Sequence, residues 1–144
     1  MKEENISFKI MQIKSERFSV SAPEGFDLED ALNNQLLQFK LHLDINGDLY
    51  QDILNIVVKF SLSLDEENKE LTGIIVRNTF EIANLKTIVI ENSLPIGFRQ
   101  YLSNIALDHS RGVHASKVTE TQLEKAFIPV IEITDVDFTE NYIN

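Results

Sequence analysis

The feature that most constrains this chain is a pair of alternating segments between residues 37 and 64, separated by Asn46-Gly47. A period of two is typical of strands with one buried face, and Asn-Gly between such segments is the strongest short-range hairpin signal. A two-residue loop at Asn46-Gly47 pairs Ile45 with Asp48 and brings both apolar sets to one face, so the pattern predicts the register as well. This register places Asp52 on the apolar side, and a bulge or a longer loop after Asp48 would remove that conflict.

Two further segments extend the hairpin into a sheet. Residues 6–22 are predicted as a strand whose apolar face changes phase twice, which indicates β-bulges or a bend between two shorter strands. Residues 71–82 alternate again and are interrupted at Asn78. Residues 26–35 fit either one helical turn or an acidic loop. Four successive strands with short turns and no helix between them predict a four-stranded antiparallel sheet.

One helix is predicted at residues 94–111. Ser93-Leu94-Pro95 provides a capping hydroxyl and then a proline, whose missing N–H costs nothing at a helix start. Gly112 suits the left-handed position after a helix end. The positions between them carry one apolar stripe at spacings of three and four: Phe98, Tyr101, Leu102, Ile105, Ala106 and His109. The expected fold is α+β, a single domain over residues 1–144, with this helix and a short C-terminal segment packed on one face of the sheet.

Composition narrows the class of protein. The 144 residues contain no cysteine, and 13 Lys and Arg face 23 Asp and Glu, for a net charge of −10. The negative charge disfavours nucleic acid as a partner, because phosphate neutralisation needs clustered basic residues. The N-terminus shows no apolar signal-peptide segment and no apolar run is long enough for membrane insertion, so a cytoplasmic protein is expected.

The three histidines offer little for catalysis. His42 falls on the polar face of a strand, His109 on the helical stripe as a hydrogen-bonded interface residue, and His114 just beyond the predicted helix end. The five-residue spacing of His109 and His114 is poor for metal ligands. The acidic residues at 65–70 fit a solvated turn better than a calcium loop. No nucleotide, nucleophile-elbow or zinc motif occurs, so we expect neither an enzyme nor a metal site.

One helix of this length cannot cover four long strands. Part of the apolar face of the sheet is therefore expected to remain uncovered by the helix. Oligomerisation or a groove for extended apolar segments would use this surface.

The order of several short motifs resembles SecB, the bacterial export chaperone family, over most of the chain. The motifs that carry the resemblance are Ser7-Phe8-Lys9-Ile10-Met11-Gln12-Ile13, Phe18-Ser19-Val20-Ser21-Ala22-Pro23, Phe80-Glu81-Ile82, the helix from near Pro95 to Ser110-Arg111-Gly112, and Ile128-Pro129-Val130 followed by Val136-Asp137-Phe138. The resemblance implies a SecB-like domain that assembles as a homotetramer, a dimer of dimers. It further implies a chaperone that binds unfolded or precursor polypeptides during protein transport and translocation, without ATP or a cofactor.

The chain also departs from the family pattern. Members dock the translocation motor SecA through acidic residues on the open sheet face, whereas the matching positions here are Arg17, Ser21 and, less directly, Gly73. These departures argue against SecA as a partner. Residues 113–127 look like an insertion, and the C-terminal helix of the family looks shortened.

The leading hypothesis is an ATP-independent holdase that binds clients in apolar grooves. Its candidate substrate-binding residues are Phe26, Phe98, Tyr101 and Leu102, each of which also fits a core or subunit-interface position. One alternative is a dedicated partner-binding module, such as a chaperone associated with a toxin–antitoxin system. A second alternative is a small-ligand binder, which a polar pocket around His109 or His114 would favour.

Overall fold

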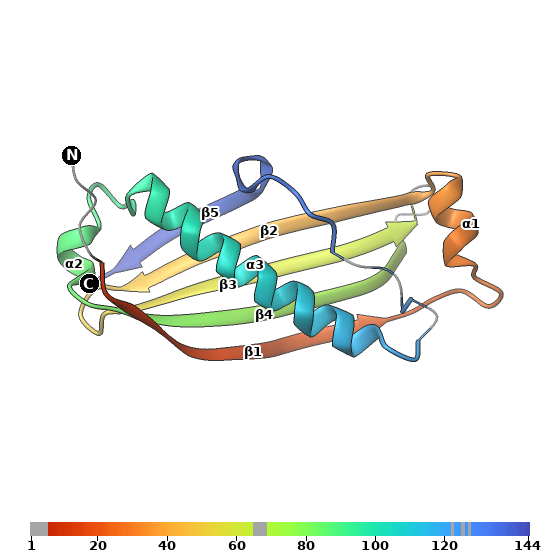
Figure 1. The fold of residues 1–144 in the computed structure, drawn as a ribbon, viewed down its shortest axis with the longest axis horizontal. Coiled ribbons are helices and arrows are strands. Elements are labelled where there is room, and N and C mark those ends of the chain that lie inside the picture. The colour runs from red at the N-terminus through yellow and green to blue at the C-terminus, as the bar shows by residue number, and fades with distance from the viewer. Residues whose placement is uncertain (1–5, 65–68, 122, 125, 127) are drawn as a thin grey trace.

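One long helix lies diagonally across a single face of a mixed sheet with the strand order β1-β4-β3-β2-β5 (Figure 1). The structure is a computed structural model that describes residues 6–64, 69–121, 123, 124, 126 and 128–144. The strands are β1 (Phe8–Val20), β2 (Leu37–Asp48), β3 (Ile53–Leu64), β4 (Lys69–Ile82) and β5 (Asp137–Ile143). The helices are α1 (Leu28–Asn33), α2 (Leu85–Ile88) and α3 (Ile96–Val118), with a 3₁₀ turn, η1 (Ile133–Asp135). The predicted α+β class is confirmed.

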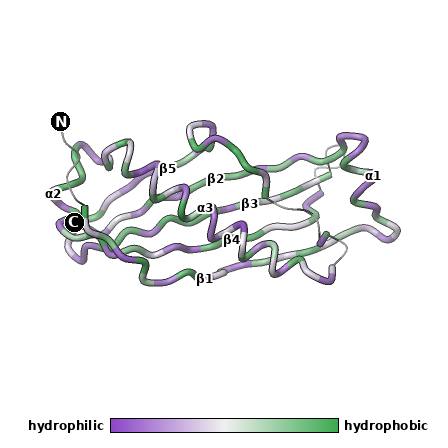
Figure 2. Tube along the Cα trace, viewed as in Figure 1, coloured by the Kyte–Doolittle hydropathy of each residue, from purple (hydrophilic) through white to green (hydrophobic). Residues whose placement is uncertain are grey.

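The predicted hairpin forms, but its turn and pairing were wrong. Asn46 and Gly47 lie inside β2, Ile45 pairs with Ile56, and Asp48 pairs with Ile53. The loop instead follows Asp48. The Asp48 side chain accepts hydrogen bonds from the backbone N–H groups of Tyr50 and Gln51, at 3.0 and 3.2 Å. The change preserves parity, so odd positions of β2 and even positions of β3 still share one face, and the hydrophobic residues still alternate along the strands (Figure 2).

The sheet has a strand that the sequence analysis did not predict. The C-terminal segment forms β5, which pairs parallel to the outer edge of β2, so the sheet is five-stranded and mixed in the described part of the chain. Its Phe138, Glu140 and Tyr142 lie in register with β2 positions that face the helix. A parallel partner of β2 requires a long crossover, which the segment between α3 and β5 provides (Figure 1).

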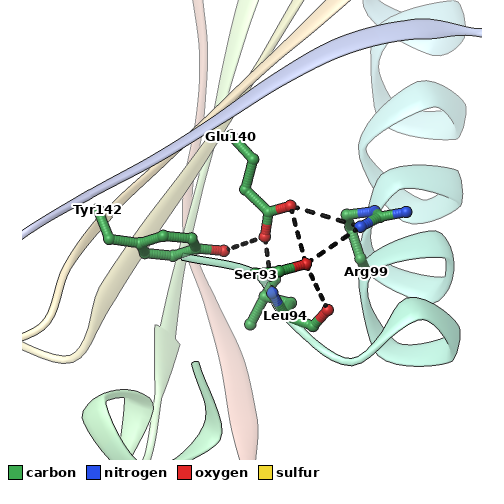
Figure 3. A network of polar contacts seen from close by, with 5 residues as sticks. All are labelled: Ser93, Leu94, Arg99, Glu140 and Tyr142. Atoms are coloured by element: carbon green, nitrogen blue, oxygen red, sulfur yellow. Dashed lines mark hydrogen bonds and ion pairs between the residues drawn. The ribbon is translucent and has the colours of Figure 1, made fainter. Parts of the chain in front are cut away.

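A buried carboxylate joins this strand to the start of α3 (Figure 3). Glu140 accepts hydrogen bonds from the Leu94 backbone N–H at 2.7 Å and from the Tyr142 hydroxyl at 2.5 Å, and it pairs with Arg99 at 3.4 Å. Burial, together with the bond to Glu140, raises the pKa of the Tyr142 phenol above its ordinary value. Ser93 does not cap the helix as expected, since its hydroxyl lies against Leu94 and Glu140 and the N-cap residue is Pro95.

The helix is longer than the predicted 94–111 and ends at Val118. Gly112 is an interior residue of α3, not its terminator, because the buried stripe continues through Ser110, His114 and Val118 at intervals of four. Burial of this stripe outweighs the helix penalty of one glycine, which is about 1 kcal/mol. Residues 26–35, which the sequence left open between a helical turn and a loop, contain the helical turn α1, and a further short helix, α2, follows β4. The charged turn predicted at 65–70 falls largely outside the described residues.

Two apolar clusters fill the space between α3 and the sheet. The first lies under the N-terminal half of α3 and includes Leu43, Ile56, Phe80, Leu102 and Ala106. The second includes Phe60, Leu71, Ile74 and the segment after the helix at Leu123, Ala126 and Ile128. In the described part of the chain, no helix is both long and apolar enough to cross a bilayer.

Candidate functional site

The edge strand β1 contains two bulges. They allow apolar side chains from both ends of the strand to face the helix. The register with β4 shifts between Ile10 and Gln12 and again between Ser15 and Arg17. Each bulge inserts one residue and so reverses the parity of the side chains that follow. Ile13 therefore returns to the same face as Phe8 and Ile10. The phase changes predicted from the sequence are confirmed.

The diagonal path of α3 leaves the N-terminal half of β1 uncovered (Figure 1). Ile10 is 45% exposed, Ile13 is 40% exposed, and Tyr101 on the adjacent flank of α3 is 56% exposed. Phe8, Phe98 and Ile105 are partly buried beside them. We call this surface the β1–α3 strip, defined as Phe8, Ile10, Ile13, Phe98, Tyr101 and Ile105. Exposed apolar side chains on neighbouring elements are typical of a binding site or an interface.

Phe8 organises one end of the strip. Its ring packs edge-on against Phe80, Phe98 and Tyr101, with centroid separations of 6.2, 5.9 and 5.9 Å. Edge-to-face pairs of this kind fix ring orientations and add about 0.5–1.5 kcal/mol each. The other end approaches Asn78, which pairs with Ile13 across the strands and lies 3.1 Å from the ring of His109 on α3. The strip is thus bounded by an aromatic cluster and by a hydrogen-bonded contact.

The four predicted binding residues do not lie together. Phe98 and Tyr101 meet through Phe8 and belong to the strip. Leu102 is fully buried beneath α3 and is a core residue. Phe26 packs against the second cluster, near α1, and not against the first. Sequence reasoning missed Phe8, Ile10 and Ile13, although the phase changes in residues 6–22 carried the signal that could have found them.

The opposite, open face of the sheet is polar and carries charges of both signs. A depression of about 540 Å³ lies there, and Arg17, Lys40, Lys59 and Gly73 are among the residues that line it. Carboxylates of Glu70, Asp135 and Asp137 also line it. Arg17 and Gly73 thus share one surface.

Asp44 anchors a small polar group at the β2 edge of this face. Its carboxylate pairs with Lys59 at 2.6 Å and accepts hydrogen bonds from Thr139 at 2.7 Å and from His42 at 2.9 Å. Partial burial acts to raise the pKa of Asp44, but the bonds from Lys59 and Thr139 outweigh it and hold that pKa below its ordinary value. His42 is therefore a half-buried partner of Asp44 and not a free surface histidine.

The other two histidines serve the interface between α3 and the sheet. His109 lies 3.1 Å from the Asn78 side chain, whose amide in turn donates to the Ile56 carbonyl. His114 is fully buried, 3.1 Å from the Thr72 hydroxyl, with its ring edge-on to Phe60. Burial lowers the pKa of His114. Neither lines the open-face depression or the smaller concavity beside Leu43 and Ser103, and the described residues contain no cluster of three or more His, Cys, Asp or Glu suited to a metal ion.

Comparison with protein-family models and with curated proteins finds no match for this chain.

Proposed function

We propose that this protein is a SecB-like, ATP-independent holdase that binds extended apolar segments of unfolded polypeptides on the β1–α3 strip. The observation that carries the proposal is the exposure of Ile10 and Ile13 on the edge strand and of Tyr101 on α3, which contacts the same strand through Phe8. The order of sequence motifs from residue 7 to residue 138 gives independent support.

The strip suits tolerant recognition of apolar side chains. Burying apolar area contributes roughly 25 cal/mol per Å², so completing the burial of a half-exposed isoleucine is worth roughly 1 kcal/mol. Several such contacts, less the cost of ordering a client, give weak and reversible binding. The fixed rings of Phe8 and Phe98 add contact area that loses little entropy on binding. No nucleotide is required by this scheme.

Self-association belongs to the same proposal. Apolar positions on the edge strand β1, including the exposed bulge residue Met11, would be covered in part by a second copy in a dimer of dimers. Docking to SecA is not part of it, because Arg17 on the open face carries a charge opposite to the family's acidic contact.

The test is suppression of aggregation of a chemically denatured client, followed by light scattering without ATP. We expect wild-type protein to suppress aggregation at about stoichiometric ratios. The double variant Ile10→Ser/Ile13→Ser should need several-fold more protein. Val130→Ser/Ile143→Ser is the matched control, since it removes two exposed apolar side chains away from the strip and should behave as wild type. No suppression by excess wild-type protein, or equal loss in both variants, would refute the proposal.

A further inference from the structure

A second concavity lies on the other flank of α3, between the helix, η1 and the strands β2 and β5. Its volume is about 290 Å³. Its apolar walls are Leu43 of β2, Ile133, Val136 and Phe138. Ile96 and Phe138, which stand at its rim, are 64% and 41% exposed, so the space opens to solvent. It shares none of the residues of the β1–α3 strip and is a separate site.

The helix directs a line of polar side chains into this space. Arg99, Gln100 and Ser103 line it together with Ile96, at the intervals of three and four that place residues on one helix face. Arg99 and Gln100 lie one turn before Ser103 and are partly exposed. The concavity therefore combines apolar walls with a few polar groups on one side, which is the usual anatomy of a small-molecule site.

Ser103 is the first polar side chain in the cavity wall. Its residue is 2% exposed, yet its hydroxyl makes no hydrogen bond within the described part of the chain. Ser110 on the same helix shows the ordinary arrangement, in which the hydroxyl donates to the carbonyl four residues back at 2.7 Å. The Ser103 side chain lines the cavity instead, so its hydroxyl is available to a polar group of a ligand that enters it.

Arg99 is the second polar side chain in the wall. One terminal nitrogen, Nη1, interacts with Glu140 at 3.4 Å, and the guanidinium lies 4.4 Å from the centroid of the Phe138 ring. These contacts hold the side chain in place, while the other end of the guanidinium points away from Glu140 (Figure 3). An arginine has five N–H donors in a fixed fork, and the unused ones suit a carboxylate.

The acidic residues near the cavity do not remove the preference of Arg99 for a carboxylate ligand. The Glu140 carboxylate does not line the cavity and already accepts bonds from Leu94 and Tyr142 in addition to Arg99. Asp137 lies in register with His42, on the open face of the sheet. Arg99 is thus the one charged side chain among the described residues that line the cavity.

We propose that this cavity binds a small monocarboxylate with an apolar body, its carboxylate at Arg99 and its body between Leu43, Ile133 and Phe138. The volume is about twice the ~150 Å³ that accommodates benzene. A ring with a short carboxylate arm fits that space. The Ser103 hydroxyl lies on the wall where it donates to an oxygen of the ligand. This proposal is independent of the holdase function.

The experiment is a titration of the full chain with phenylpropanoate, followed by NMR of the methyl groups, with phenylpropanol as the neutral comparator. We expect saturable shifts at Leu43, Ile133 and Val136, and about tenfold weaker binding of the alcohol, as expected for loss of a charged hydrogen bond. Arg99→Gln should remove the difference between acid and alcohol. Arg111→Gln, the same charge change further along α3, should preserve it. Ser103→Leu should fill the cavity and abolish binding of both ligands.

The acid–alcohol comparison in wild-type protein needs no variant and decides the proposal if a variant fails to fold. Equal binding of acid and alcohol would overturn it, as would the absence of saturation up to about 10 mM, since a ligand of this size in a formed pocket should bind more tightly. Shifts confined to other parts of the chain, or an equal effect of Arg99→Gln and Arg111→Gln, would overturn it too.

Discussion

Gly47 lies directly beneath the aromatic ring of Tyr142. A methyl group on the Gly47 α-carbon would come within 2.6 Å of the ring atom Cε1, closer than side chains can approach. The two residues are partners in the parallel register of β2 and β5. The glycine is therefore required by the close approach of the neighbouring strand, a common reason for glycine inside a strand.

Gly47→Ala should destabilise the protein by about 1–3 kcal/mol, because the added methyl must displace the Tyr142 ring from its packed position. The free energy of unfolding is measured by urea denaturation, and amide exchange reports the β5 strand separately. Exchange should accelerate in β5 more than in β3. Unchanged stability would show that the ring can move aside freely.

The same glycine explains where prediction from sequence succeeded and where it failed. Alternation in residues 37–64 is a local property, so the strands and their shared buried face could be predicted. The role of Gly47 depends on Tyr142, far away in the chain, and no local pattern distinguishes a turn glycine from one beneath a ring. The parallel pairing of β5 was missed for the same reason.

The residues of the candidate site also separate into those that a local sequence pattern could predict and those that depend on long-range packing. Phe98 and Tyr101 were found because helical spacing is local. Ile10 and Ile13 differ in parity along the chain, so they share a face only because of the bulge between them, and that bulge could be inferred from the sequence but not placed. Leu102 is buried because α3 crosses the sheet diagonally, and that crossing direction depends on long-range packing.

Glu140→Gln should lower the free energy of unfolding by about 1–3 kcal/mol. The Leu94 N–H and the Tyr142 hydroxyl both donate to Oε2, whereas Ser93 and Arg99 interact with Oε1. An amide offers one acceptor oxygen in place of two, so one of these two pairs of donors meets an NH₂ group and loses its partner. The measurement is urea denaturation. Glu132→Gln is the control, since Glu132 is exposed before η1 and its substitution should change stability by less than about 0.5 kcal/mol. Equal effects of the two substitutions would contradict a role for this network.

Gly112→Ala should stabilise the protein by about 0.5–1 kcal/mol. Gly112 is inside α3, and a methyl group there would meet no atom within 4 Å, so alanine gains helix propensity without a clash. If the helix ended at Gly112, as the sequence alone suggested, alanine would instead be neutral or destabilising. A thermal melt distinguishes the two cases by the sign of the shift in Tm.

The stability of the protein should decrease as the pH falls below about 6.5, the ordinary pKa of histidine. Burial lowers the pKa of His114 in the folded chain, so the unfolded chain binds a proton first on acidification and unfolding becomes more favourable. The pKa of the Asp44 carboxyl is also lowered, but protonation of Asp44 affects stability only at pH values below about 3.8, the ordinary pKa of that group. His114→Gln can keep a hydrogen bond to Thr72 but cannot titrate, so its free energy of unfolding should vary less between about pH 7 and pH 5. Urea denaturation across this range gives both slopes. Identical slopes for wild type and His114→Gln would show that another group controls the pH dependence.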